Sequence, residues 1–279
     1  MSGKSISISD AEAKQLTRFQ FGENWARFLS RLDDQQIRHA EICLKRMLEV
    51  EDLRGRSFID VGAGSGLSSL AARRMGASVF SFDCDPQSLW CAQSLKQQFC
   101  PEDPKWMIAA GSILDAAWLR SLEQYDIVYS WGVLHHTGAM WQALANIDSL
   151  VAPRGKLFIA IYNDQGRVSD FWREIKRLYN RLPQRLGFLL TWPALIFLWG
   201  PRTLKDLFHG RPFHTWRTYA KSRGMSPWHD LVDWVGGYPF EVAKPEAIIE
   251  FFVKRGFELQ KLNACGRQLG CNEFVFTKL

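Results

Sequence analysis

Residues 57–66 read SFIDVGAGSG, and this stretch is the strongest indication of the fold class. The apolar run 57–61 predicts a buried strand, three glycines follow it, and the amphipathic segment 67–75 predicts a helix. Glycine adopts backbone angles that other residues avoid and lets a ligand approach the main chain. The start of a helix offers unpaired N–H groups. Strand, loop and helix together predict a nucleotide site in an α/β protein.

The spacing of the glycines distinguishes two kinds of nucleotide loop. A dinucleotide loop follows G-x-G-x-x-G or G-x-G-x-x-A, and Leu67 stands where its third small residue would fall. Glycines at 62, 64 and 66 after Asp60 instead give D-x-G-x-G-x-G. A carboxylate ahead of the loop repels phosphate but holds an ammonium. The loop therefore suits a ligand that carries an ammonium and ribose hydroxyls.

Short apolar runs and amphipathic segments alternate outward from this stretch. We expect strands at 78–82, 106–109, 125–131 and 156–162, and helices at 86–99 and 140–151. This repetition predicts a parallel sheet covered on both faces. A helix at 245–254 precedes strands at 257–262 and 273–278. These two strands have no room for a helix between them and should pair antiparallel.

Composition divides the chain into four parts. These are an N-terminal helical lid (1–52), a nucleotide-binding core (53–162), a basic, Trp-rich helical cap (163–240) and a C-terminal helix with a strand pair (241–279). The chain has a net charge of +6, and residues 167–223 alone carry 12 Lys and Arg against 3 Asp and Glu. Pro201, Pro212 and Pro227 are expected to divide the cap into short helices.

Length and composition exclude several classes of protein. The 279 residues are 47% hydrophobic, which is enough for a core and argues against disorder. Six cysteines without a C-x-x-C pair indicate reduced thiols, so neither a disulfide scaffold nor a zinc ribbon is expected. Residues 1–10 contain no apolar signal segment, so a cytoplasmic location is expected. The apolar stretch 186–200 is too short to span a membrane and contains Pro193.

Three further positions lie where predicted parallel strands end, which is where open α/β sheets bind ligands. Asp83 follows the second strand, and a carboxylate there accepts ribose hydroxyls. The loop 111–115 follows the third strand, where an adenine could lie. The run YSWGVLHHT at 129–137 closes the fourth strand.

At these residues the chain resembles class I S-adenosylmethionine-dependent methyltransferases, nearest the branch of the ubiquinone and menaquinone biosynthesis methyltransferases. The glycine loop, Asp83 and the run VLHH at 133–136 carry the resemblance, which covers 53–162 and more loosely 241–279. It implies a Rossmann-like α/β fold: a seven-stranded, mainly parallel sheet with a reversed last strand, here with a helical cap insertion. It also implies S-adenosylmethionine as cofactor and S-adenosylhomocysteine as product.

The resemblance implies roles for matching residues. The methionine end would be held by Asp60, Gly62 and Gly64 and bordered by Trp131, the ribose would be held by Asp83, and the adenine by Ser112 and Ile113; Ala63 and Cys84 complete the predicted cofactor set. No metal site is predicted.

Four residues are candidates for acting on the acceptor. Transfer from an activated donor depends mainly on alignment, and a phenol, enol or amine acceptor also needs a base, for which histidine is suited. His136 and His229 are the candidate bases, although each could simply stabilise a helix. Tyr238 and Glu241 either orient the acceptor or form the hinge of the cap.

The favoured function is O-methylation of a small lipophilic or anionic acceptor. Nucleic acid is disfavoured, because residues 130–133 lack the proline pair common in base amino methylases and no cysteine stands there. The cap either closes over substrate or makes peripheral membrane contact through 186–205, with Trp192, Trp199 and flanking basic residues as anchors. The alternatives are a non-catalytic S-adenosylmethionine-binding protein, a nicotinamide oxidoreductase and a membrane-surface interaction protein. The oligomeric state is not predicted.

Overall fold

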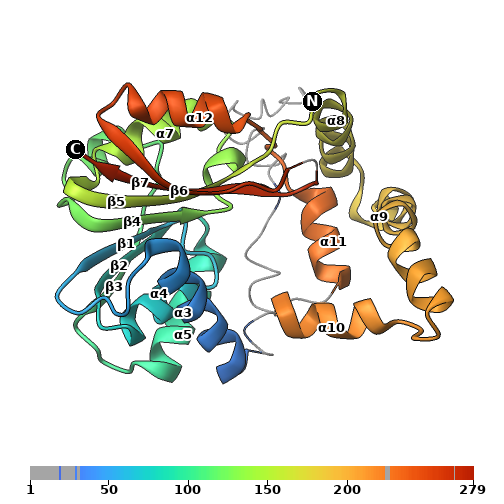
Figure 1. The fold of residues 1–279 in the computed structure, drawn as a ribbon, viewed down its shortest axis with the longest axis horizontal. Coiled ribbons are helices and arrows are strands. Elements are labelled where there is room, and N and C mark those ends of the chain that lie inside the picture. The colour runs from blue at the N-terminus through green and yellow to red at the C-terminus, as the bar shows by residue number, and fades with distance from the viewer. Residues whose placement is uncertain (1–18, 20–28, 30–31, 224–226, 267) are drawn as a thin grey trace, which may run out of the picture.

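A seven-stranded sheet forms the centre of the computed structural model, which describes residues 19, 29, 32–223, 227–266 and 268–279 (Figure 1). The strands are β1 (Ser57–Val61), β2 (Ser78–Asp83), β3 (Trp106–Ala110), β4 (Tyr125–Trp131), β5 (Val151–Tyr162), β6 (Phe257–Asn263) and β7 (Cys271–Lys278). Their order is β3-β2-β1-β4-β5-β7-β6. β7 runs antiparallel to both β5 and β6, and the other neighbouring strands pair in parallel. The predicted mainly parallel sheet with a reversed last strand is confirmed.

Helices cover both faces of the sheet (Figure 1). One face carries α3 (Asp34–Leu48), α4 (Leu67–Arg74) and α5 (Pro86–Phe99), and the other carries α7 (Met140–Asp148) and α12 (Pro245–Val253). A short helix, α6 (Ala116–Leu119), follows β3. Successive residues of β1 face opposite sides: Phe58 is buried under α3 and α4, and Ile59 is buried on the other face. Burial on both faces explains why the strands are continuously apolar.

The N-terminal region differs in part from the predicted lid. Helix α3 belongs to the layer over the sheet, because its side chains Ile37, Leu44 and Leu48 are buried against that face. Of the preceding residues, 1–18, 20–28 and 30–31 lie outside the described part of the chain. Phe19 is described, and its N–H donates to the carbonyl of Tyr238 (3.1 Å) at the base of the cap.

One predicted boundary is wrong. The helix expected at 140–151 ends at Asp148, and β5 begins at Val151 rather than at Lys156. Val151 already pairs with Tyr125, and the register shifts before Lys156 pairs with Ile127. Strand pairing therefore extends across the Pro153–Gly155 segment that we expected only to end the helix.

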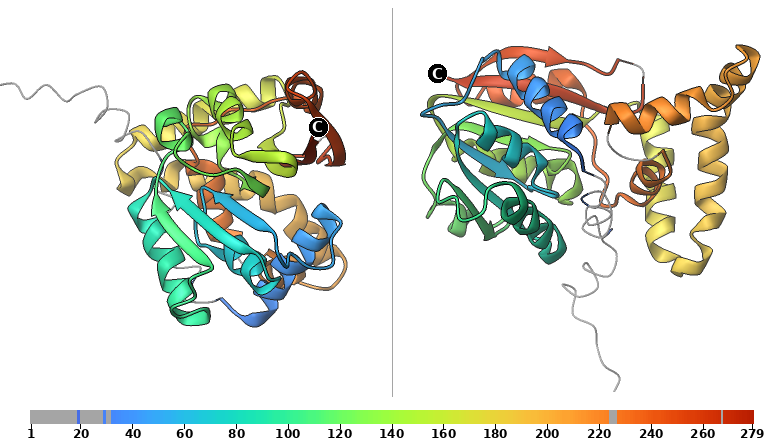
Figure 2. Two further views of the ribbon diagram at one scale, coloured as in Figure 1. Left: turned by 90° about the vertical axis from the view of Figure 1, so that its left-hand side faces the viewer. Right: turned by 90° about the horizontal axis from the view of Figure 1, so that it is seen from below.

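The cap extends from one end of the sheet (Figure 2). It consists of α8 (Arg167–Arg181), a 3₁₀ turn η2 (Gln184–Leu186), α9 (Phe188–Phe208), α10 (His214–Arg223) and α11 (Pro227–Gly236). Trp172, Ala194, Leu231, Val235 and Phe240 form its small core. The predicted break at Pro201 is wrong, because α9 continues through both Pro193 and Pro201. A proline keeps a helical φ, but it removes one N–H donor and crowds the carbonyl one turn earlier. Burial of Ala194 and Trp199 stabilises the helix around the two prolines.

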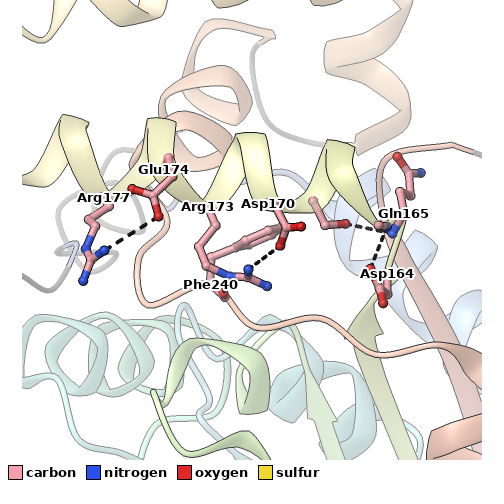
Figure 3. Close-up of polar contacts among 9 residues, drawn as sticks. Asp164, Gln165, Asp170, Arg173, Glu174, Arg177 and Phe240 are labelled. Carbon is pink, nitrogen blue, oxygen red and sulfur yellow. Dashed lines mark hydrogen bonds and ion pairs between the residues drawn. The ribbon is translucent and has the colours of Figure 1, made fainter.

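Side chains of α8 fasten the cap to the segment that leads back to the sheet (Figure 3). Arg173 donates to the carbonyl of Phe240 (3.4 Å) and forms an ion pair with Asp170 (2.6 Å). On the buried side of α8, the ammonium of Lys176 donates to the carbonyl of Trp234. The same nitrogen lies 4.3 Å from the Trp234 ring centroid and 4.7 Å from that of Phe240. These contacts hold α8, α11 and the return segment together.

Candidate functional site

The glycine loop between β1 and α4 forms a close backbone turn. Gly62 and Gly64 have positive φ angles of 76° and 54°. A Cβ on Gly62 would lie 2.4 Å from a methyl carbon of Val133, so only glycine fits there. The N–H groups of Gly62 and Ala63 donate to the carbonyl of Phe82 (2.9 and 3.0 Å), which fixes the loop against the end of β2.

Asp60 lies beneath this loop and is 2% exposed. Ser69 donates to its carboxylate (2.5 Å), and Ser69 is in turn bonded to Ser81 (2.7 Å). Trp106 donates its indole N–H to Ser81 (2.9 Å). Each hydrogen bond of this series therefore donates in the direction of Asp60. Burial nevertheless raises the pKa of Asp60 to about 7. A buried carboxylate at the cleft wall is suited to a ligand cation, which would offset the cost of its burial.

Asp83 lies at the end of β2, beside the same loop. Its two carboxylate oxygens accept from the backbone N–H groups of Gly64 (3.0 Å) and Asp85 (2.9 Å). These bonds fix the orientation of the carboxylate toward the cleft. Since each carboxylate oxygen accepts more than one hydrogen bond, the arrangement fits a pair of ribose hydroxyls.

The loop after β3 presents a different residue from those predicted for adenine. Ile113 is buried in the core, and its carbonyl accepts from the side chain of Asn146 (2.8 Å). Ser112 accepts from the N–H of Leu114 (3.2 Å). Among the described residues of this loop, Leu114 lines the cleft, whereas Ser112 and Ile113 do not. Sequence alone could not show which apolar residue of the loop faces outward.

Trp131 lies at the end of β4, and its position depends on a residue that the sequence did not indicate. The Trp131 indole N–H donates to Glu273 on β7 (2.7 Å). Glu273 also accepts from the side chain of Asn263 on β6 (2.7 Å). Trp131, Asn263 and Glu273 all line the cleft. The sequence feature that could have indicated Glu273 is its position near the start of the reversed strand, where it pairs with Ala160 near the end of β5.

The two histidines after β4 form a 3₁₀ turn, η1 (Leu134–His136), and differ in their surroundings. His135 is fully buried, and burial holds its pKa well below the usual range. Its Nδ1 accepts from the N–H of Tyr162 (3.3 Å), which indicates a packing role. His136 lines the cleft, and its Nδ1 lies 2.6 Å from the carbonyl of Pro239. A carbonyl only accepts, so Nδ1 carries the proton and the neutral ring has its lone pair on Nε2.

The remaining predicted acceptor residues are dispersed. Tyr238 lines the cleft. Glu241 instead accepts from the N–H of Met140 (3.0 and 3.2 Å) at the start of α7, so its carboxylate caps that helix. Glu241 is not among the described residues that line the cleft. His229 lies in α11, and its side chain lies outside the part that the structure describes.

Gly236 is the last residue of α11, and a Cβ there would lie 2.2 Å from the ring of Phe19. The missing side chain therefore lets Phe19 pack against α11. Phe19 also lines the cleft, which places this part of the N-terminal region at its wall.

The residues described above as lining the cleft belong to one cavity of about 2000 Å³. A typical small-molecule site has roughly 300–1000 Å³, so the cleft has room for two ligands. The sheet supplies one wall, with Asp60, the glycine loop, Asp83 and Trp131. The cap supplies the other wall, where aromatic and charged side chains gather: Phe197, Trp199, Arg202, Tyr219, Asp230 and Trp234. No group of three or more His, Cys, Asp or Glu able to hold a metal occurs in the described ranges.

A family comparison decides the class of the protein. Residues 25–218 match the methyltransferase domain family. The chain belongs to this family. Together with the seven-stranded sheet, the match makes it a class I S-adenosylmethionine-dependent methyltransferase, as the sequence predicted, and S-adenosylmethionine is its methyl donor.

Curated relatives of this methyltransferase act on different acceptors. A tRNA U34 carboxymethyltransferase from Pseudoalteromonas translucida is 32% identical over 39% of this chain and 33% of its own length. A ubiquinone biosynthesis O-methyltransferase from Parvibaculum lavamentivorans is 27% identical over 48% of this chain and 50% of its own length. The matches thus span a third to a half of these relatives. The expectation that nucleic acid is an unlikely partner is not supported by these relatives.

Solved structures share the fold of this methyltransferase at low identity. Magnesium protoporphyrin IX methyltransferase from Synechocystis, solved with bound S-adenosylhomocysteine, covers 97% of this chain and 100% of its own, with a TM-score of 0.57 and 13% identity. An O-methyltransferase family protein from Burkholderia thailandensis covers 87% of this chain and 57% of its own, with a TM-score of 0.53 and 12% identity. These likenesses concern the fold alone.

Proposed function

We propose that this methyltransferase transfers the methyl group of S-adenosylmethionine to an oxygen of a lipophilic, ring-containing acceptor bound against the cap. The observation that carries the proposal is the two-walled cleft. Its sheet wall has buried and oriented carboxylates, and its cap wall has aromatic side chains and Arg202. Aromatic rings favour a flat acceptor, and a guanidinium favours an acceptor with a negative group.

The sheet wall fits the cofactor. Gly62 and Gly64 let it approach the main chain, Asp60 would hold its ammonium, and Asp83 would hold the ribose hydroxyls. We place Leu114 at the adenine in addition to the predicted Ser112 and Ile113, because Leu114 faces the cleft. Trp131, held by Glu273, would border the methionine portion. Ala63 and Cys84 also line the cleft. When bound, S-adenosylmethionine supplies a methyl group already activated by its sulfonium.

The protein then has to orient the acceptor and take its proton. His136 is the proposed base, because the lone pair of its Nε2 can accept the hydroxyl proton while Nδ1 is held by the Pro239 carbonyl. Tyr238 would orient the acceptor. His229 stays a second candidate on α11. Glu241 is not retained, because both of its carboxylate oxygens accept from the N–H of Met140.

Calorimetric titration with S-adenosylhomocysteine tests the cofactor half of the proposal. We expect micromolar binding by the natural protein and at least about tenfold weaker binding by Asp83→Ala, equivalent to about 1.4 kcal/mol. NADH serves as the control ligand and should not bind. Absence of S-adenosylhomocysteine binding to folded protein, or binding of NADH instead, would overturn this half.

Methyl-labelled S-adenosylmethionine tests the acceptor half. The label should enter an alkylated catechol rather than a simple amine or bulk tRNA. His136→Ala should lower kcat at least about tenfold while S-adenosylhomocysteine affinity stays unchanged, because the base acts on the acceptor. Labelling of tRNA or of amines alone would refute the proposed acceptor class. Cofactor binding with no labelling of any acceptor would favour a non-catalytic role.

A further inference from the structure

The outer face of α9 is apolar over most of its length. Eight large apolar side chains of this helix are more than half exposed: Phe188, Leu189, Trp192, Ile196, Phe197, Leu204, Leu207 and Phe208. Figures 1 and 2 both show α9 at the end of the molecule away from the sheet. Contiguous exposed apolar surface of this kind marks a site of contact with another apolar surface.

Basic side chains border this apolar face at both of its ends. Arg181 and Arg185 precede α9, Lys205 lies in its last turn, and Arg211 follows it. All four are exposed, and none takes part in an ion pair between described residues. The described chain has no helix that meets the length and hydropathy needed to cross a bilayer. An apolar helix with basic ends and no capacity to span is suited to lie in the plane of a membrane interface.

We infer that α9 docks on the surface of an anionic lipid bilayer. The choice of occupant follows from charge. A second copy docked by the same face would bring two basic borders together, which is unfavourable in a two-fold interface. A nucleic acid would match the charge but would gain nothing from exposed Leu189 and Ile196. A bilayer with anionic headgroups matches both the basic ends and the apolar ridge.

The docking face is continuous with the cleft. Phe197 is exposed on α9 and also lines the cleft, as do Trp199, Pro201 and Arg202 of the same helix. An acceptor dissolved in the bilayer would therefore meet the cap wall by moving along α9. This part of the inference rests on the proposed function, and it names the acceptor class as a membrane-partitioned molecule.

Vesicle sedimentation of the full chain tests the docking face without any turnover. The probes are vesicles of phosphatidylcholine alone and of phosphatidylcholine mixed with phosphatidylglycerol. We expect binding at least about tenfold stronger to the anionic vesicles, weakening as salt is raised. Leu189→Glu with Ile196→Glu should lower that binding at least tenfold. Arg181→Gln with Arg185→Gln and Lys205→Gln should remove the preference for anionic lipid.

A matched control comes from the sheet side of the molecule. Ile42 on α3 is 60% exposed, against 67% for Ile196, so Ile42→Glu introduces the same charge at an equally exposed isoleucine. It should leave vesicle binding unchanged. Equal loss in Ile42→Glu, or no vesicle binding by the natural protein, would overturn the inference. If the natural protein is a dimer in solution and Leu189→Glu with Ile196→Glu dissociates it, the face binds a second copy instead of lipid. If the protein binds tRNA and only the arginine substitutions abolish that binding, the face binds nucleic acid instead.

Two readouts separate this inference from the proposed function. The α9 variants lie outside the cleft lining, so their affinity for S-adenosylhomocysteine should equal that of the natural protein. Their turnover should fall for a long-chain catechol embedded in vesicles and stay unchanged for a soluble short-chain catechol. Vesicle binding without any turnover would refute the proposed acceptor and leave the docking face standing.

Discussion

Each wall of the cleft has a buried ionisable group, Asp60 on the sheet side and Lys176 within the cap, and the two groups differ in their surroundings. Asp60 on the sheet side accepts a hydrogen bond from Ser69 and also lines the cleft. Lys176 on the cap side is enclosed by the Trp234 carbonyl and by three rings, with its nitrogen 5.8 Å from the Tyr162 centroid. The Asp60 carboxylate therefore faces the cleft, whereas the Lys176 ammonium has its contacts within the cap.

The two buried groups differ in their access to a ligand. Burial raises the pKa of Asp60 to about 7 and lowers that of Lys176 to about 7, so both ionised forms are destabilised. A ligand cation can restore the charge of Asp60 but has no access to Lys176. We therefore expect changes on the sheet wall to alter cofactor affinity, and a change at Lys176 to alter only stability.

Gly62→Ala should have the largest effect on the sheet wall. The new Cβ meets Val133 at 2.4 Å, and the positive φ is strained for alanine. Calorimetry should show at least about a 100-fold loss of S-adenosylhomocysteine affinity, about 2.7 kcal/mol. Gly55→Ala is the control, because Gly55 also has a positive φ but nothing lies within 4 Å of its Cβ position. Equal losses in the two variants would show that backbone strain alone is responsible.

Asp60→Asn should separate affinity from stability. In the natural protein, the pKa of Asp60 is 3.8 unfolded and about 7 folded, so ligand-free stability falls as pH rises between these values. Asparagine removes that slope, and the free energy of unfolding at pH 8 should rise by about 2–4 kcal/mol. Affinity for S-adenosylhomocysteine should fall about tenfold at pH 8.

Urea unfolding and calorimetry at several pH values check both expectations for Asp60. The natural protein should bind S-adenosylhomocysteine more tightly as pH rises through 7, and Asp60→Asn should lose that dependence. Glu258→Gln, an exposed residue of β6 outside the cleft lining, is the control. A variant that lost affinity and also lost stability would indicate a purely structural role for Asp60.

Lys176→Met should give the opposite pH dependence on the cap wall. The folded pKa of Lys176, about 7, lies below its unfolded value of 10.5, so natural stability rises with pH between these values. The variant should be about 1–3 kcal/mol more stable at pH 6, and this gain should shrink as pH approaches 10. Its affinity for S-adenosylhomocysteine should not change. Urea unfolding measures the gain, and an unaltered pH slope would contradict it.

Glu273→Gln should have the smallest effect. Glutamine keeps one acceptor for Trp131 or Asn263 but loses the charge that strengthens both bonds. Because these side chains are partly exposed, affinity for S-adenosylhomocysteine should fall by only about threefold. Glu258→Gln, on the neighbouring strand and outside the cleft lining, should have no effect. A loss as large as that of Asp60→Asn would place Glu273 in direct contact with the cofactor.

The sheet wall was predictable from sequence because its signals are local. Strand, glycine loop and helix follow one another within twenty residues, and buried parallel strands leave a continuous apolar pattern. The series of hydrogen bonds from Trp106 through Ser81 to Ser69 was not predictable, because two adjacent strands and a helix bring these residues together. The direction of a side chain within a loop also could not be predicted from sequence, so Leu114 was not among the residues expected to line the cleft.

The cap was predictable in composition but not in arrangement. The cap is helical, as its composition indicated. The expected break at Pro201 is wrong, because α9 continues through this residue and tertiary packing outweighs the loss of one helical hydrogen bond. Glu241 was expected either to orient the acceptor or to form the hinge of the cap. It caps a helix 101 residues earlier in the chain, and no local pattern reports such a contact.

The attachment of the cap resembles the base of a hairpin. The chain leaves the sheet after Tyr162 and returns at Ala243, and the two points are joined by Ala243 N–H to the Tyr162 carbonyl (3.0 Å) and Asp164 N–H to the Ala243 carbonyl (3.2 Å). An insertion closed at its base transmits little of its own length or shape to the sheet. Residues 165–242 are therefore an insertion whose two ends meet at the sheet. Its length can change without moving β5, as long as the Pro239 contact with His136 and the Glu241 cap on α7 are kept.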